Sequence, residues 1–191
     1  IHWGDGTTEN IARTAASATH TYLIPGGTRS ITMTATDEDG TFPMNGSPLV
    51  VTVLNTAPSA PTLSDSVVPG LVRGGAVGTL SFSDPDTGDS HTWTVSDNRF
   101  TVNGSTLKLK SGRQLDPVTE STVTLSVTVT DANGASGTAT FTLRVNKPPA
   151  STSDAYLVDG TQQLSIGSPS LGVLANDIDA DGDAFSASLI S

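Results

Sequence analysis

A run of alternating aspartates around Gly182 forms the densest group of possible metal ligands in the chain: Asp177, Asp179, Asp181 and Asp183. Two carboxylates about 5 Å apart repel each other by roughly 3 kcal/mol at an effective dielectric constant of 20, so four of them together favour a hard cation. The spacing matches the start of an EF-hand loop, but Ser188 occupies the twelfth position and the flanking pattern is that of strands. We therefore expect Ca²⁺ in a loop between strands, with a solvated Asp/Gly turn as the alternative.

A second acidic group lies about 95 residues earlier in the chain, where Asp84, Asp86 and Asp89 occur within six residues. The same argument predicts that they hold Ca²⁺, with Asp116 as a contributor from a distant part of the sequence. A solvated turn is again the alternative. Three other aspartates are expected at hairpin tips, where hydrogen bonds to the turn backbone account for them, with a metal role as the alternative: Asp37, Asp39 and Asp131.

The three histidines fall in expected strands close to aromatic residues, and none has the spacing of a zinc site. We expect all of them to be partly buried structural residues: His2, His20 and His91. Trp3 and Trp93 are expected to anchor the core, and sugar stacking is the alternative for them. Because no nucleophile elbow, phosphate-binding glycine loop or catalytic triad is recognisable, we expect no enzymatic activity.

Composition narrows the classes of partner. The 191 residues include 9 basic and 19 acidic side chains, which gives a net charge of −10 and a pI near 4.4. Such a field opposes binding to nucleic acid or to an anionic membrane surface. The sequence has no cysteine and therefore no disulfide, and no apolar run approaches the ~20 residues of a membrane span.

Acidic turn motifs recur at a fixed distance. The segment 34–40 recurs 94 residues later at 128–134, and the motif that begins at Asp84 recurs 95 residues later with its first residue at Asp179. This period predicts one complete domain over 56–146, with a partial domain at 1–55 and another at 147–191. We expect the chain to begin and to stop in the middle of a domain.

Alternation of apolar and polar residues predicts strands throughout the complete domain. Val123, Leu125, Val127 and Val129 alternate with Thr and Ser, and the residues after the turn at 131–137 alternate in the same way. Further strands are expected at 77–83, 91–97, 99–102 and 105–110. The pattern predicts an all-β protein of tandem immunoglobulin-like Greek-key sandwiches, and the Pro-containing linkers predict an elongated rod.

The motifs of the middle domain resemble those of bacterial cadherin-like repeats. Residues 82–93, Phe-Ser-Asp-Pro-Asp-Thr-Gly-Asp-Ser-His-Thr-Trp, resemble the DxDxG turn of that family and the aromatic strand after it. Residues 114–120, Gln-Leu-Asp-Pro-Val-Thr-Glu, and the strand at 127–131 resemble the LDRE motif and the strand that follows it.

The flanking segments resemble related families. Residues 1–55 are similar to the back part of a PKD domain, through Trp-Gly-Asp-Gly-Thr at 3–7 and His-Thr-Tyr at 20–22. Residues 154–191 are similar to the opening of a further cadherin-like or VCBS-type adhesin repeat, through Asp-Ala-Tyr at 154–156 and the aspartate run at 177–183.

These resemblances imply an extracellular bacterial surface or secreted protein that calcium stabilises and that acts in adhesion or as a spacer. Two features depart from the family pattern. The acidic linker is reduced to Asn-Thr-Ala-Pro at 55–58 and Asn-Lys-Pro-Pro at 146–149, and residues 117–119 separate Asp116 from Glu120. Calcium is the expected partner, with cell-surface glycans or neighbouring copies of the chain as further partners.

Two other functions stay open. PKD-like domains often accompany catalytic domains, so the chain is alternatively an ancillary module of a secreted enzyme that degrades polysaccharide or protein. The two partial domains also suggest a head-to-tail extracellular fibre, in which one copy completes the next.

Overall fold

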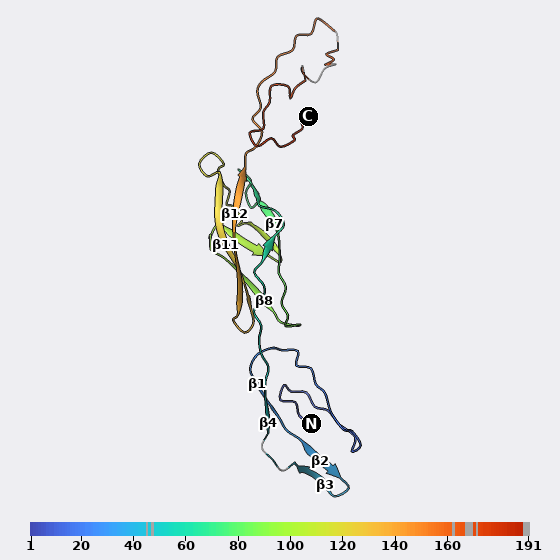
Figure 1. Ribbon diagram of the computed structural model, residues 1–191. Helices are drawn as coiled ribbons and strands as arrows, with labels where there is room; N and C mark the ends of the chain where they lie inside the picture. The colour runs from blue at the N-terminus through green and yellow to red at the C-terminus, as the bar shows by residue number, and fades with distance from the viewer. Residues whose placement is uncertain (45, 47, 162, 167–169, 171, 189–191) are drawn as a thin grey trace. The chain divides into compact units, whose positions relative to one another are not determined.

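Strands make up the regular secondary structure of this chain (Figure 1). The computed structural model describes residues 1–44, 46, 48–161, 163–166, 170 and 172–188, and these contain twelve β-strands and no α-helix. The all-β prediction is therefore confirmed. In the same part of the chain, no helix has the length and hydrophobicity needed to span a membrane.

The chain divides into two compact units, each assembled from separate stretches of sequence. The first consists of Ile1–Thr62, Ser81–Thr94 and Val127–Ala139, and the second of Leu63–Leu80, Val95–Ser126 and Thr140–Ser191. Each acidic loop therefore lies within one unit, residues 84–91 in the first and residues 177–183 in the second. The domain boundaries expected after residues 55 and 146 remain predictions.

Four short strands before the linker form two antiparallel pairs. They are β1 (Thr28–Ile31) with β4 (Leu49–Thr52), and β2 (Thr34–Asp37) with β3 (Gly40–Pro43). Asp37 Oδ1 accepts a hydrogen bond from the backbone N–H of Asp39 at 3.0 Å, which closes the turn between β2 and β3. The expected position of both aspartates at a hairpin tip is confirmed.

Two four-stranded sheets follow in the sequence. One has the order β5 (Thr62–Leu63), β7 (Ala76–Ser81), β10 (Thr106–Leu109) and β9 (Phe100–Asn103). The other has the order β6 (Val67–Pro69), β12 (Ser136–Asn146), β11 (Thr122–Asp131) and β8 (His91–Val95). Four of these strands correspond to those expected at 77–83, 91–97, 99–102 and 105–110. The pairs β7/β10 and β9/β10 are antiparallel, and β6 joins β12 in parallel.

The core follows the alternation seen in the sequence. Along β11, the odd-numbered residues from Val123 to Asp131 are buried, and the residues between them are exposed or half-buried. The same strand pair carries a ladder of hydroxyl contacts: Thr124 to Thr142, Ser126 to Thr140 and Thr128 to Thr138. Burial of each Val or Leu side chain stabilises the fold by roughly 1.5–3 kcal/mol, so β11 is a main support for the loops at its ends.

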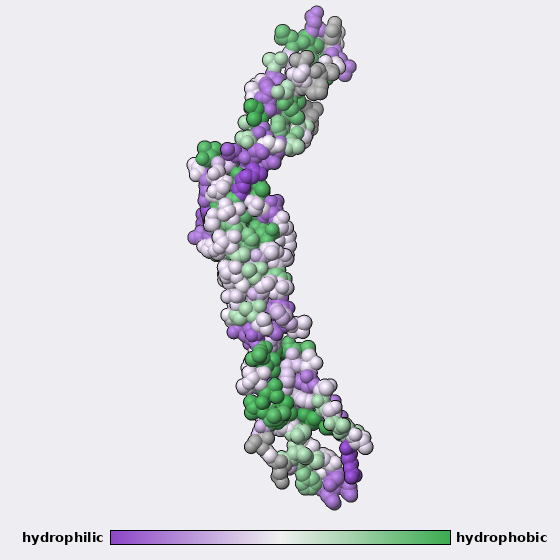
Figure 2. Space-filling view, in the orientation of Figure 1, coloured by the Kyte–Doolittle hydropathy of each residue, from purple (hydrophilic) through white to green (hydrophobic). Residues whose placement is uncertain are grey.

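Residues 1–55 bury much less apolar surface. Among the described residues, the buried hydrophobic side chains of this segment are Trp3 and Ile31, each 9% exposed. Apolar surface lies open around β1 and β4 (Figure 2) and includes Leu49 at 64% and Val50 at 63% exposure. The stability of the chain therefore depends mainly on the side chains between Val68 and Val145.

The linker at 56–61 runs against β12 at Gly137. A Cβ atom at this position would lie 2.4 Å from the carbonyl oxygen of Ser59 and 2.5 Å from that of Pro58. No side chain fits between these backbones, so only glycine permits the approach. This contact holds the start of the linker beside the turn that carries Asp131.

Candidate metal centres

Asp84 and His91 form the centre of the first candidate site. Asp84 lies in the loop between β7 and β8, where its Oδ1 atom accepts the backbone N–H of Asp86 at 2.8 Å. Its Oδ2 atom accepts a hydrogen bond from Nε2 of His91, the first residue of β8, at 2.7 Å. The Asp84 side chain is only 6% exposed. The bond from His91, and then that from Asp86, lower the pKa of Asp84 below its ordinary value.

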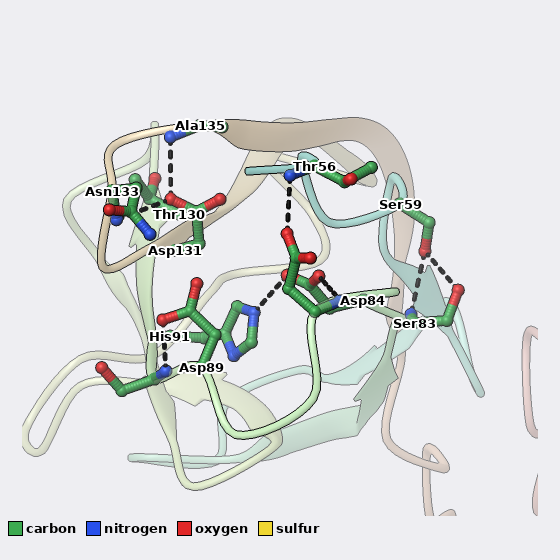
Figure 3. A network of polar contacts seen from close by, with 12 residues as sticks. Thr56, Ser59, Ser83, Asp84, Asp89, His91, Thr130, Asp131, Asn133 and Ala135 are labelled. Atoms are coloured by element: carbon green, nitrogen blue, oxygen red, sulfur yellow. Dashed lines mark hydrogen bonds and ion pairs between the residues drawn. The ribbon is translucent and has the colours of Figure 1, made fainter. Parts of the chain in front are cut away.

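Asp89 completes a group of three possible ligands. Its Oδ1 atom accepts the backbone N–H of Ser90 at 2.8 Å, while its Oδ2 atom is buried and has no hydrogen-bond partner among the described residues. The imidazole of His91 lies between the carboxylates of Asp84 and Asp89 (Figure 3), and one ligand atom from each residue lies within 4.8 Å of the others. An oxygen buried in this way calls for a cation or a donor, because an unsatisfied charged acceptor is costly.

Packing fixes the orientation of His91. Its ring meets Phe82 edge to face at a centroid distance of 4.7 Å, and Phe82 meets Trp93 at 5.4 Å. The expectation that His91 is partly buried is confirmed, since its side chain is 16% exposed. Its position between the carboxylates was not expected, because the sequence pattern was interpreted as a strand residue that packs beside Trp93.

Asp131, which was expected at a hairpin tip, is the buried last residue of β11. The residue is 5% exposed. Its Oδ1 atom accepts hydrogen bonds from the backbone N–H groups of Asn133 and Ala135. Its Oδ2 atom accepts a hydrogen bond from Nδ2 of Asn55 at 2.9 Å. These bonds, with that from Asn55 the largest cause, lower its pKa. Its negative charge in turn opposes the lowering of the Asp84 pKa. The alternation on β11 could have revealed it, because Asp131 continues the buried odd-numbered series.

Asp86 and Asp116 make other contacts. Asp86 Oδ2 accepts the backbone N–H of Thr56 at 2.6 Å, so this carboxylate ties the loop to the linker. Asp116 is exposed, and its Oδ1 atom accepts the backbone N–H of Val118 at 2.9 Å. Neither belongs to a group of close ligand atoms among the described residues, so their roles as ligands remain predictions.

The second candidate site contains Asp179, Asp181 and Asp183, whose possible ligand atoms lie within 4.8 Å of one another. Asp179 Oδ1 accepts the backbone N–H of Asp181 at 2.9 Å and that of Asp183 at 3.1 Å. Asp177 lies outside this group, and its Oδ1 atom accepts the backbone N–H of Thr152 at 2.7 Å. The expected crowding of carboxylates is thus found for three of the four residues.

A guanidinium group distinguishes the second site from the first. Arg144 Nη1 lies 2.9 Å from Asp181 Oδ2, which also accepts the backbone N–H of Lys147 at 2.6 Å. The bond from Lys147 is the largest cause of a lowered pKa at Asp181, and Arg144 adds to it. At the first site, no Lys or Arg ion pair with Asp84 or Asp89 occurs in the described part of the chain.

Trp3, His20 and His2 lie outside both groups of close ligand atoms. Trp3 is 9% exposed and stacks on His20 at 4.8 Å, in agreement with its expected role in the core. His20 Nε2 also pairs with Asp5 at 2.7 Å. The prediction for His2 is wrong, because it is exposed: it lies in isolated bridges with Thr8 and Thr32, whose backbone contacts do not cover its side chain.

Comparison with known proteins gives similarity to solved structures alone. No protein-family model matches the chain, and no curated protein matches it. The chain is similar to the human desmocollin-1 ectodomain, with 20% identity over 66% of this chain and 28% of that one, at a TM-score of 0.36. It is similar to Drosophila N-cadherin EC1-4, with 24% identity over 63% and 32% and a TM-score of 0.38. It is also similar to the extracellular cadherin domains 1-4 of protocadherin gamma B7, with 14% identity over 71% and 51% and a TM-score of 0.37. The chain thus spans between 28% and 51% of these structures.

Proposed function

We propose that this chain is a calcium-stabilised, non-catalytic module of an extracellular bacterial surface or secreted protein, where it acts in adhesion or as a spacer. The observation that carries the proposal is the collection of possible ligand atoms within 4.8 Å at both acidic loops. Carboxylate oxygens are the ligands that Ca²⁺ prefers, and the remaining ligands of its six to eight would be water or backbone oxygens.

The repeated contacts at the two loops support this proposal. In each loop, the first aspartate of an Asp-x-Asp motif accepts the backbone N–H of the second, as Asp84 does for Asp86 and Asp179 does for Asp181. The second aspartate then accepts a backbone N–H from a linker. Two loops with the same construction are suited to the same task, the fixing of a linker by an acidic loop. The adhesion or spacer role and the absence of catalysis are supported by the sequence motifs alone.

Calcium titration tests the proposal. The chain, stripped with EDTA, is melted at increasing Ca²⁺, with Mg²⁺ as the comparison because its smaller ion requires a stricter octahedron. Free Ca²⁺ at a hundred times its dissociation constant stabilises a protein by about 2.7 kcal/mol, so the melting temperature should rise by several degrees.

Variants locate the ion. Asp179→Asn should weaken calcium binding at the second loop, whereas Asp159→Asn, which changes an exposed carboxylate outside both loops, should leave the titration unchanged. If millimolar Ca²⁺ gives no stabilisation of the unaltered chain, the proposal is wrong.

A further inference from the structure

The first acidic loop contains a nitrogen ligand, which a calcium site made of oxygen ligands does not need. A ring nitrogen of His91 is one of three possible ligand atoms that lie within 4.8 Å of one another, together with one oxygen of Asp84 and one of Asp89. Of the two ring nitrogens, Nε2 lies 2.7 Å from Asp84 Oδ2. Calcium binds hard oxygen ligands, whereas imidazole nitrogen suits zinc, copper and nickel. The second loop has no histidine in its group, so the two sites differ in chemistry.

The buried Oδ2 atom of Asp89 provides an independent indication of a ligand. It has no hydrogen-bond partner among the described residues, although the other oxygen of the same carboxylate, Oδ1, accepts a hydrogen bond from the backbone N–H of Ser90. The carboxylate of Asp84 lies on the opposite side of the His91 ring from that of Asp89 (Figure 3). In the described part of the chain, no Lys or Arg forms an ion pair with either carboxylate, so the negative charge of the site is not balanced by these residues. A cation bound to Asp89 Oδ2 would give this oxygen a partner and would also reduce the repulsion between the carboxylates of Asp84 and Asp89.

The donors are held in place before any ion arrives. Phe82 packs against the ring of His91, and the backbone N–H of Asp86 fixes the Asp84 carboxylate. The Ser90 N–H does the same for Asp89. Donors that are already oriented lose little freedom on binding, which favours affinity.

We infer that Asp84, Asp89 and His91 form a three-ligand site for a borderline divalent ion of the Zn²⁺ class, coordinated by His91 Nε2 and one oxygen of each carboxylate. Water takes the fourth position, as in zinc sites with three protein ligands. The inference deepens the proposed function, on which it rests for the binding of a divalent ion by these carboxylates. Zinc and calcium then compete for Asp84 and Asp89, and only zinc uses the histidine.

The hydrogen-bonded pair of His91 and Asp84 must open to admit the ion. Two ligands about 2.0–2.1 Å from a tetrahedral ion lie roughly 3.3 Å apart. His91 Nε2 and Asp84 Oδ2 are 2.7 Å apart, so the pair must open by roughly 0.6 Å when the ion replaces the shared proton. The displaced proton leaves to solvent or moves to Nδ1, because the coordinating nitrogen must be free of it.

Isothermal titration of the EDTA-stripped full chain with ZnCl₂, and separately with CaCl₂, tests the inference. His91→Gln retains a donor for Asp84 and removes the imidazole, so it should weaken zinc binding at least tenfold while calcium binding changes less than threefold. The matched control is His2→Gln, which alters an exposed histidine and should bind zinc as the unaltered chain does. Melting in EDTA verifies that both variants fold.

The outcomes separate the two proposals. Calcium binding without zinc binding, or zinc affinity equal in His91→Gln and the unaltered chain, overturns the inference and leaves the calcium proposal standing. Zinc binding that depends on His91, without calcium binding, supports the inference and removes the calcium proposal at this loop. If His91→Gln does not fold, the visible spectrum of the unaltered chain with Co²⁺ decides: tetrahedral absorption that Asp89→Asn abolishes supports the site, and an octahedral spectrum overturns it.

Discussion

Asp181 accepts the backbone N–H of Lys147 at 2.6 Å, and this contact has the same length as the one between Asp86 and Thr56. The two acceptors lie 95 residues apart and the two donors 91 residues apart. Each donor directly follows an asparagine, Asn55 or Asn146. The repeat that the sequence shows as motifs therefore recurs in the structure as hydrogen bonds, with an arginine added at the later copy.

Arg144 supplies a built-in positive charge at the second loop. Replacing it in Arg144→Gln removes the ion pair with Asp181 at 2.9 Å and leaves the charge of Lys147 as the remaining side-chain cation that acts on Asp181. We expect a melting temperature in EDTA that is lower by a few degrees at most, since Arg144 is 42% exposed, and a larger gain from calcium. Melting with and without Ca²⁺ measures both. Arg113→Gln, at an exposed position, is the control, and an unchanged response to calcium would contradict the prediction.

Asp97 contributes stability that depends on pH. Its hydrogen bonds with Arg99, which also pairs with Glu120 at 2.6 Å, lower the pKa of Asp97. A carboxyl whose pKa is lower in the folded state stabilises the fold above its unfolded pKa near 3.9, and this contribution is lost as the pH falls through the folded value.

We therefore expect Asp97→Asn to cost about 0.5–1 kcal/mol at pH 7, a modest figure because both partners remain partly exposed. The difference from the unaltered chain should shrink as the pH falls below about 4. Urea unfolding at a series of pH values measures it. An equal cost at pH 7 and pH 2 would show that the charge of Asp97 is not responsible.

Asn55 connects the linker to the buried carboxylate of Asp131. Asn55→Ala removes the bond from Nδ2 to Asp131 Oδ2 at 2.9 Å and the bond that Asn133 donates to Asn55 Oδ1 at 2.9 Å. Because a buried charged acceptor then loses a donor, the melting temperature should fall by several degrees. Asn55→Asp provides the contrast: it places a second carboxylate beside Asp131, so calcium should restore its stability and should not restore that of Asn55→Ala.

Gly137 lies where the backbones of the linker and β12 approach each other closely. A methyl group at Gly137→Ala would meet the backbone oxygens of Pro58 and Ser59 at 2.5 and 2.4 Å, so the strand or the linker must move. Forcing extra volume into such a contact costs about 1–3 kcal/mol. Urea unfolding measures the loss, and Ser136→Ala on the exposed neighbour should cause almost none. If Gly137→Ala is as stable as the unaltered chain, the linker moves away from β12 at no cost in free energy, and the prediction is wrong.

Local patterns were enough to predict the strands β7 to β12. The alternation from Val123 to Val129 depends only on which side of a strand each residue faces, and its buried and exposed positions are as expected. Crowded carboxylates are also a local property, so Asp84 with Asp89, and Asp179 with Asp181 and Asp183, could be predicted to converge.

Contacts between distant segments could not be read from the sequence. The bond between Asn55 and Asp131 joins residues 76 positions apart, and nothing in either segment specifies the other. Likewise, Glu120 pairs with Arg99, a residue that no motif singles out. The position of His91 beside Asp84 follows from the loop of 84–90 folding back on the start of β8, which the six intervening residue types do not dictate.

The hydroxyl ladder on β11 and β12 gives this strand pair a face on which threonine and serine side chains satisfy one another. These hydroxyl groups carry no charge and hydrogen-bond to one another across the two strands. Because the groups on this face are uncharged, contacts made through it should change little with ionic strength.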